Sequence, residues 1–462
     1  MIWRAPWLQS RLHRGSLALW DSLSLLALYQ LIYGLRLGAL PGVTGGLIGL
    51  ECIWVFGSYL LGRYSEQTWS DEQKSWRSFK KIIFIALLML SVMIGDSWIR
   101  NIVDSQVRFR GFLLPLTTLM MVSSGLADHL LAAKKRPALR WVLIGSITEQ
   151  KILHQELLEE SPATQSSTVL LVSEDQASVN REIQAAQRAN SRHSTVKHGF
   201  ALSEQGDLPS ATLNQLLELR SRGVHICSMI DWAEHTLHRV PPELLSQAWL
   251  VKADGFRLAP GTTSWRSKRL IDVIGALGLL TLSAPILTLA AILIWLEDRG
   301  PIFYSQLRTG LGGKPFWILK LRTMRPDAEA GQGALWALKG DSRITTVGQW
   351  LRRLRLDELP QLLSVIRGEM SLIGPRPERP EIESTLESKI PHYRVRQWLR
   401  PGLSGWAQVC FPYGASVSDS RTKLCYDIYY LRHAGLLLDL LITIKTIRLV
   451  SRARGSVPRA NT

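Results

Sequence analysis

The clearest candidate for a membrane-spanning helix is Ile82-Ile-Phe-Ile-Ala-Leu-Leu-Met-Leu-Ser-Val-Met-Ile-Gly95, an apolar run interrupted by a single serine. It lies in one of four apolar stretches near the start of the chain, at residues 16–35, 43–62, 82–99 and 111–133. Each approaches the ~20 residues that a helix needs to cross ~30 Å of hydrocarbon. The alternative is a set of buried helices in a soluble domain, but four such stretches in succession favour a four-helix membrane bundle over residues 1–137.

Two of these stretches contain an acidic residue, Asp21 in the first and Glu51 in the second. A charged side chain is costly in hydrocarbon, so acids inside spans usually face the interior of a helix bundle. We therefore expect both carboxylates to contribute to packing between helices.

Basic residues predict the orientation of the bundle. If the N-terminus is cytoplasmic, the outer loops hold only Arg36, Arg100, Arg108 and Arg110, whereas the inner segments hold three times as many Lys and Arg residues. This asymmetry follows the positive-inside rule and places residues after 134 in the cytoplasm. The first apolar run is longer than a typical signal peptide and is not clearly followed by a small-residue cleavage site, so we expect a retained anchor.

The composition narrows the class of protein further. The chain has 462 residues, 46% of them apolar, and a formal net charge of +17. That apolar content excludes a disordered chain. Its four cysteines form no C-x-x-C pair, which argues against a disulfide framework or a structural zinc site. The basic excess favours a polyanionic partner, which could be nucleic acid, an anionic membrane face or a phosphorylated substrate.

Residues 138–258 alternate between strand and helix patterns. Short buried strands are predicted at 141–145, 168–172 and 223–227, and helices at 176–190 and 210–221. This alternation is typical of an α/β, Rossmann-like domain. The first strand ends in Gly145-Ser-Ile-Thr-Glu149, which lacks the second and third glycines that bring the backbone close to a dinucleotide. We therefore predict a domain that binds no redox cofactor.

A fifth apolar stretch, from Leu270 to Leu296, contains Ser283-Ala284-Pro285 near its middle. Proline removes a backbone donor and clashes with the preceding helical turn, so we expect a kink or break at Pro285. Composition alone leaves two interpretations open, a kinked span or a helix that enters the membrane and returns to the same face.

Most residues of catalytic type lie after position 297. Asp357 and Glu358 are adjacent and follow Arg352, Arg353 and Arg355. A carboxylate among arginines is expected to stay ionised, which suits a nucleophile or a Mg²⁺ ligand. The alternative is a solvated helix face with ordinary ion pairs.

The tripeptide Pro375-Arg376-Pro377 is a second candidate. The flanking prolines restrict the backbone, which would hold the guanidinium of Arg376 for a phosphate. An ordinary rigid turn is the alternative. No H-E-x-x-H, G-x-S-x-G or G-x-x-x-x-G-K-[ST] motif occurs, so the chemistries of those motifs lack support.

The order of the motifs over residues 265–450 resembles that of the bacterial sugar transferases, the monotopic polyprenyl-phosphate phosphoglycosyl transferases. The resemblance lies in K-R-L-I-D from Lys268, the proline-containing apolar helix, R-G-P-I-F-Y from Arg299, K-L-R-T-M, D-x-R-I-T, L-D-E-L-P-Q, M-S-L-I-G-P-R-P-E-R-P, R-P-G-L-S-G-W-A-Q and Y-D-x-Y-Y from Tyr426. The upstream region is similar to the larger subclass, which has several spans and a Rossmann-like domain.

This resemblance implies a function. Such enzymes transfer a sugar 1-phosphate from a nucleotide sugar, commonly a UDP-sugar, to undecaprenyl (polyprenyl) phosphate and release UMP. The step begins exopolysaccharide, capsule or O-antigen-type synthesis. The resemblance also implies that Asp357 is the nucleophile, that Glu358 assists it, and that Mg²⁺, with Asp357 as a ligand, neutralises the diphosphate. Lys320, Arg322, Arg352 and Arg376 are the candidates for binding phosphate oxygens.

The resemblance favours a re-entrant helix at 270–296, because nucleotide sugars are cytoplasmic and a full crossing would place Asp357 outside. The transferase domain is then mainly α-helical and lies on the cytoplasmic face of the bacterial inner membrane, in contact with lipids. Residues 436–450 have the pattern of an interfacial helix, and residues 451–462 are expected to form a basic tail.

Two departures from the family pattern affect the expected site. The family usually has Ser directly before the helix-breaking Pro, whereas here Ala284 intervenes and the hydroxyl belongs to Ser283. Leu354 and Arg355 stand where a small hydroxyl residue is common before the acidic pair, and an extra cation there could alter the choice of donor.

Two other functions are less consistent with the sequence. A nucleotide-sugar epimerase or dehydratase needs NAD and a Tyr-x-x-x-Lys motif, but residues 138–258 contain no tyrosine. A basic scaffold for nucleic acid would show interleaved aromatic and basic residues, whereas these arginines cluster around acids and prolines. We therefore expect no nucleic-acid partner. The sequence does not specify the sugar or whether the chain forms a homo-oligomer.

Overall fold

The computed structural model describes residues 6–38, 40–64, 71–99, 112–133, 138–190, 196–204, 208–256, 258, 261–325, 343–411 and 416–451. The predicted basic tail lies outside these residues, apart from Ser451. The chain forms two compact units, one made of Met1–Ile144, His154–Phe200 and Asp207–Ile226, and the other of Gly145–Leu153, Ala201–Gly206 and Cys227–Thr462. Residues 227–252 therefore group with the C-terminal region, although the predicted middle domain extends to residue 258.

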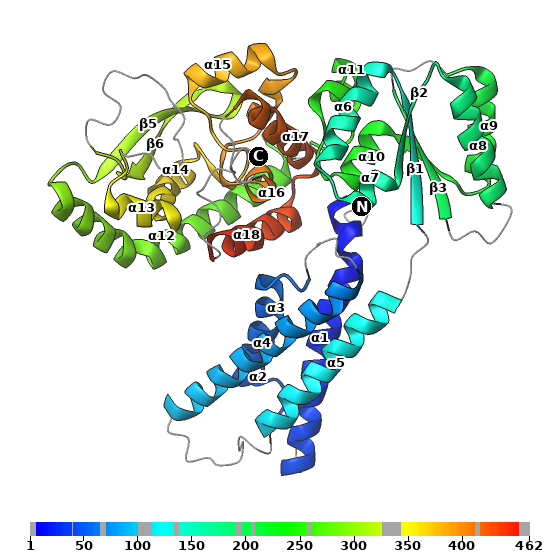
Figure 1. Ribbon diagram of the computed structural model, residues 1–462. Helices are drawn as coiled ribbons and strands as arrows, with labels where there is room; N and C mark the ends of the chain where they lie inside the picture. Colours follow the sequence, from blue (N-terminus) through cyan, green and yellow to red (C-terminus); the bar gives the residue numbers. More distant parts are fainter. Residues whose placement is uncertain are drawn as a thin grey trace. The chain divides into compact units, whose positions relative to one another are not determined.

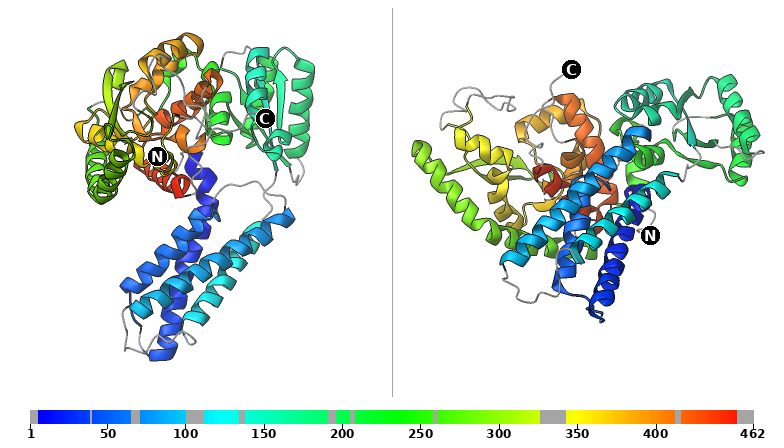
Figure 2. Two further views of the ribbon diagram at one scale, coloured as in Figure 1. Left: turned by 60° about the vertical axis from the view of Figure 1, so that its left-hand side comes forward. Right: turned by 60° about the horizontal axis from the view of Figure 1, so that its bottom comes forward.

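The N-terminal part of the first unit is helical, as the apolar stretches predict. Its elements are α1 (Pro6–Leu37), α2 (Gly45–Glu51), the π-helix η2 (Cys52–Phe56), α3 (Gly57–Leu60), α4 (Asp71–Ile99) and α5 (Leu114–Ala133). The long helices α1, α4 and α5 lie side by side (Figures 1 and 2). Their facing sides bury a shared apolar core that includes Leu25, Ile85 and Leu116.

A buried charged network joins these helices. Asp21 of α1 is fully buried, pairs with Arg63 and accepts a 2.7 Å hydrogen bond from the hydroxyl of Ser124 in α5. Arg63 also pairs with Asp128 of α5 at 3.1 Å. The carboxylate of Asp21 therefore faces the bundle interior, as predicted.

Within the described residues, two helical segments are long and apolar enough to cross a membrane, Gly15–Leu35 and Thr263–Asp298, and Gly45–Leu60 is a shorter apolar segment. The first two match the predicted first and fifth apolar stretches. The stretches at 43–62, 82–99 and 111–133 are helical where they are described, and their membrane crossing stays a prediction.

The middle region contains a four-stranded sheet in the order β2-β1-β3-β4. Its strands are β1 (Ala138–Gly145), β2 (Thr168–Val172), β3 (Val196–Leu202) and β4 (His225–Ser228), and helices α6 (Ile147–Leu158), α7 (Pro162–Ser166), α8 (Gln176–Asn190) and α9 (Ser210–Ser221) connect them. Helices α8 and α9 lie side by side (Figure 1). The predicted α/β character is confirmed. Strand β3 was not predicted, because Lys197, His198 and Gly199 interrupt its apolar pattern.

The second unit carries the candidate site. It contains two two-stranded sheets, with β5 and β6 antiparallel and β7 and β8 parallel. Its elements are α10 (Met229–Thr236), η4 (Pro242–Leu244), α11 (Gln247–Lys252), α12 (Thr263–Asp298), β5 (Phe303–Thr309), η5 (Leu311–Gly313), β6 (Pro315–Leu321), α13 (Thr346–Arg353), η6 (Leu356–Gln361), α14 (Leu362–Arg367), β7 (Ser371–Ile373), α15 (Pro380–Lys389), η7 (Tyr393–Trp398), β8 (Gly402–Ser404), α16 (Trp406–Cys410), α17 (Val417–His433) and α18 (Leu436–Ser451). Helices thus predominate, as predicted.

Helix α12 continues through Pro285 without a break. The carbonyl that a proline deprives of its partner is the one four residues earlier, here that of Thr281. The hydroxyl of Ser283 instead donates to the carbonyl of Leu280 at 3.3 Å. Proline thus does not end the helix, and a return of this segment to one membrane face stays a prediction.

Both ends of α12 are bonded to polar groups of the second unit. Near its start, Lys268 pairs with Asp439 of α18 at 2.7 Å, and Asp272 accepts a 2.7 Å hydrogen bond from Ser371. At its end, Asp298 pairs with Arg322, the residue directly after β6. Between these ends, α12 exposes a series of large apolar side chains, which includes Leu277, Leu282, Ile286, Leu289 and Leu293.

Candidate active site

The adjacent acids Asp357 and Glu358 lie in the first turn of the 3₁₀ helix η6. Helix α13 ends at Arg353, and Arg355 then adopts a left-handed conformation with φ 56° that redirects the chain into η6. A non-glycine residue rarely adopts this conformation, which carries a small strain. The turn buries both acids, with Asp357 9% and Glu358 8% exposed. The alternative of a solvated helix face is therefore wrong.

Glu358 is surrounded by cations from three parts of the chain. It pairs with Arg376, with Lys320 at 3.7 Å and with Arg355 at 3.3 Å. Burial alone would raise its pKa, but these positive charges and the hydrogen bond from Arg376 hold the pKa of Glu358 well below its usual range. Glu358 is therefore an ionised anchor that holds these three cations together.

Asp357 has a different environment. Among the described residues its carboxylate accepts no hydrogen bond and forms no ion pair within 4 Å. Burial and the neighbouring charge of Glu358 raise the pKa of Asp357 above its ordinary value, while Lys320, Arg352 and Arg355 oppose that rise. The two acids thus differ in the direction of their pKa: the cations that contact Glu358 lower its pKa, whereas at Asp357 burial and the charge of Glu358 outweigh the cations nearby.

Lys320 reaches the acids from the end of strand β6, which pairs with β5 through the register Tyr304 to Lys320. Its burial lowers the pKa of Lys320 to about 8, since the attraction of Glu358 is offset by the positive charges of Arg376 and Arg308. Lys320 therefore changes charge close to physiological pH. At Arg376 the attraction of the Glu358 carboxylate outweighs burial and raises the pKa.

The structure brings together two of the four predicted phosphate ligands, Lys320 and Arg376, at Glu358. Arg352 is nearby, since its charge acts on Asp357, but its Nε donates to the hydroxyl of Thr323 at 2.8 Å. The guanidinium of Arg322 instead donates to Asp298 at 2.6 Å and thereby fixes the end of α12. Its predicted contact with phosphate is not supported by this placement and stays a prediction.

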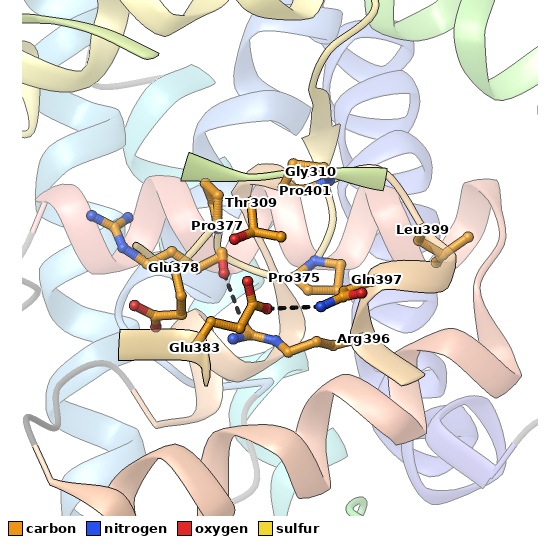
Figure 3. Close-up of a pocket in the computed structure, with 11 residues that line it drawn as sticks. Thr309, Gly310, Pro375, Pro377, Glu378, Glu383, Arg396, Gln397, Leu399 and Pro401 are labelled. Atoms are coloured by element: carbon orange, nitrogen blue, oxygen red, sulfur yellow. Dashed lines mark hydrogen bonds between the residues drawn. The ribbon is translucent and has the colours of Figure 1, made fainter. Parts of the chain in front are cut away.

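A small pocket lies beside the Pro375–Pro377 loop (Figure 3). Its walls include the polar side chains of Thr309, Glu378, Glu383, Arg396 and Gln397. Of these residues, Arg396 was not singled out from sequence, and neither was its partner Asp427. Asp427 could have been predicted from its position in the Y-D-x-Y-Y motif, whereas Arg396 belongs to none of the motifs that the sequence analysis identified.

The side chains available near the acidic pair determine how a metal ion could bind there. No group of three or more His, Cys, Asp or Glu side chains with suitable geometry occurs in the described ranges. Mg²⁺ is commonly held by one or two carboxylates together with substrate phosphates and waters. The carboxylate of Asp357 fits that mode, because Glu358 is already occupied by three cations.

Comparison with known proteins identifies relatives of the second unit. Residues 263–453 match the family described as bacterial sugar transferase. The UDP-N-acetylgalactosamine-undecaprenyl-phosphate N-acetylgalactosaminephosphotransferase of Aeromonas hydrophila is 43% identical over 189 residues, 41% of this chain and 44% of that protein. The chain thus spans less than half of this relative's length.

Two other relatives are covered more completely. The UDP-glucose:undecaprenyl-phosphate glucose-1-phosphate transferase of Caulobacter vibrioides is 46% identical over 182 residues, 39% of this chain and 68% of that protein. The exopolysaccharide production protein ExoY of Rhizobium meliloti is 39% identical over 204 residues, 41% of this chain and 88% of that protein. The chain therefore belongs to the bacterial sugar transferase family.

Proposed function

We propose that this protein transfers a sugar 1-phosphate from a UDP-sugar to undecaprenyl phosphate, with release of UMP, as the first membrane step of exopolysaccharide, capsule or O-antigen-type synthesis. The acceptor is supported by the names of the Aeromonas and Caulobacter relatives, both of which contain undecaprenyl phosphate. Those names include both glucose and N-acetylgalactosamine, so the proposal specifies the donor only as a UDP-sugar.

The observation that carries the proposal is the asymmetry of the acidic pair. Glu358 is neutralised by Arg376, Lys320 and Arg355, whereas the Asp357 carboxylate has no hydrogen bond within the described part of the chain. A nucleophile needs oxygens that are not already occupied, and the cations around its neighbour can bind the phosphates of the donor. Asp357 and Glu358 thus have separate roles.

In the proposed reaction, an Oδ atom of Asp357 forms a bond to the β-phosphorus of the UDP-sugar. The bond from that phosphorus to the bridging oxygen breaks, and UMP leaves with the electron pair. A phosphate oxygen of undecaprenyl phosphate then attacks the same phosphorus, which breaks the acyl phosphate bond and restores the Asp357 carboxylate. Mg²⁺, held by Asp357 and the donor phosphates, would neutralise negative charge in the diphosphate.

The proposal places the site on the cytoplasmic face of the inner membrane, where nucleotide sugars occur. Support comes from α12, since its two ends bond to Asp439 and Arg322 of the same compact unit. A segment that crossed the membrane completely would separate those partners by ~30 Å of hydrocarbon. Exposed leucines on α12 and on α18, including Leu436 and Leu440, are suited to contact with lipid.

Release of UMP tests this function. The full chain, purified in detergent with Mg²⁺, is mixed with undecaprenyl phosphate and individual UDP-sugars. Asp357→Asn is expected to abolish release, because an amide oxygen is a poor nucleophile. The control is Glu381→Gln, since that side chain is 62% exposed on α15 and should retain normal activity. Unchanged release by Asp357→Asn, or no release by the unaltered protein with any UDP-sugar, would contradict the proposal.

A further inference from the structure

The Pro375–Pro377 loop is held at each of its three carbonyl oxygens. The carbonyl of Pro375 accepts a 2.8 Å hydrogen bond from the backbone nitrogen of Gly402. The carbonyl of Arg376 accepts one at 2.8 Å from Arg396, and that of Pro377 accepts one at 3.1 Å from Arg308. Proline has no N–H group, so at two of these residues the carbonyl is the only backbone group that can be held.

The buried guanidinium of Arg396 is one of the groups that hold this loop. Its side chain is 7% exposed and its Nη1 donates to the hydroxyl of Tyr393 at 2.6 Å. The hydrogen bond from its Nη2 to the Arg376 carbonyl is drawn in Figure 3. A buried guanidinium is costly unless it is paired, and Asp427 of α17, only 2% exposed, supplies the opposite charge at 3.1 Å.

The guanidinium of Arg376 contacts Glu358. Its side chain is 36% exposed, so it needs a fixed backbone to keep it directed at the acidic pair. The described structure shows no hydrogen bond or ion pair from Arg396 to Asp357 or Glu358, so any effect of Arg396 on the reaction must pass through Arg376.

We propose that Arg396 is a positioning residue, which fixes the backbone of Arg376 so that its guanidinium is directed at Glu358 and at the donor phosphates. Asp427 is its counter-ion, and Arg308 holds the next carbonyl of the same loop. This inference rests on the proposed function, because it assigns a role within that transfer reaction.

A double-mutant cycle between positions 396 and 376 tests the inference. Arg396→Lys keeps the charge opposite Asp427 but loses the planar fork that also reaches Tyr393 and the Arg376 carbonyl. We expect its kcat/KM for UMP release to fall about 100-fold, the loss that a small misplacement of a catalytic group can cause. In the Arg376→Gln background, the same substitution should change kcat/KM less than twofold, because the group that it positions is already absent.

Arg394→Lys is the matched control, since Arg394 lies in the same helix η7 but is 77% exposed. It should keep normal activity in both backgrounds. Thermal unfolding of every variant identifies losses that come from misfolding. If Arg396→Lys is unstable, Arg308→Lys replaces it in the cycle, because it weakens the hold on the same loop from strand β5.

The outcomes separate the two proposals. Additive losses in folded variants would overturn the positioning role of Arg396 and leave the proposed function intact. Non-additive losses with a normal Arg394→Lys control would support it. Failure of the unaltered protein to release UMP would refute the proposed function, and the positioning role would fail with it.

Discussion

Lys320→Arg is expected to move the alkaline limb of the pH profile for UMP release. Burial lowers the pKa of Lys320 to about 8, so this side chain is charged below that pH and neutral above it. The charged form pairs with Glu358 at 3.7 Å and, in the proposed reaction, binds donor phosphate. Activity that needs this charge must therefore fall as the pH rises through about 8.

The size of the effect follows from the pKa. With a pKa of about 8, only about a tenth of Lys320 is protonated at pH 9. The kcat/KM of the unaltered protein should then fall roughly tenfold between pH 7 and 9, since kcat/KM reports groups of the free enzyme. Arginine stays charged throughout this range, so the Lys320→Arg variant should lose less than twofold from its own value at pH 7.

The assay measures initial rates of UMP release at low UDP-sugar concentration from pH 6 to 9.5. Lys314→Arg is the control, because Lys314 is exposed in the turn before the same strand, and it should keep the limb near pH 8. An alkaline limb that stays near pH 8 in Lys320→Arg would show that another group titrates. A flat profile to pH 9 in the unaltered protein would refute the reasoning directly.

Two further predictions concern other parts of the fold. Gly402→Ala should destabilise the second unit and reduce UMP release. The reason is that an added Cβ would overlap the backbone of Gly374, next to the paired strands β7 and β8. Unchanged thermal unfolding and activity of this variant would contradict the prediction. Arg63→Met should reduce the stability of the N-terminal helices by about 3–5 kcal/mol, since it leaves the buried Asp21 without its cation. The double variant Arg63→Met with Asp21→Asn should recover part of the lost stability, as measured by thermal unfolding in detergent. A further loss of stability of the same size would show that Arg63 and Asp21 do not act as a pair.

Local sequence patterns predicted several elements closely. The helices at 176–190 and 210–221 and the strand at 168–172 have the same limits in the structure. Such patterns work because the spacing of apolar residues directly reflects helical or strand periodicity. They failed for β3, where polar residues interrupt the alternation.

The candidate site was predictable only in part. The acidic pair and Pro375-Arg376-Pro377 are contiguous motifs, and the structure indeed brings Arg376 to Glu358 across 18 positions of the chain. Arg322 was predicted together with Lys320 as a phosphate ligand, but it lies one residue beyond the end of strand β6. The structure pairs Arg322 with Asp298 and Lys320 with Glu358, a difference in partners that the shared K-L-R-T-M motif does not indicate.

The order of residues was enough to recognise the family, the apolar segments and the two acids, because each of these is a property of residues close together along the chain. The tertiary structure alone decided which acid is neutralised, since the cations around Glu358 come from β6, the residue before η6 and the Pro375–Pro377 loop. It also decided that Arg396 and Asp427 support that loop. Charge interactions depend on distance and burial in space, and neither quantity can be read from the order of residues.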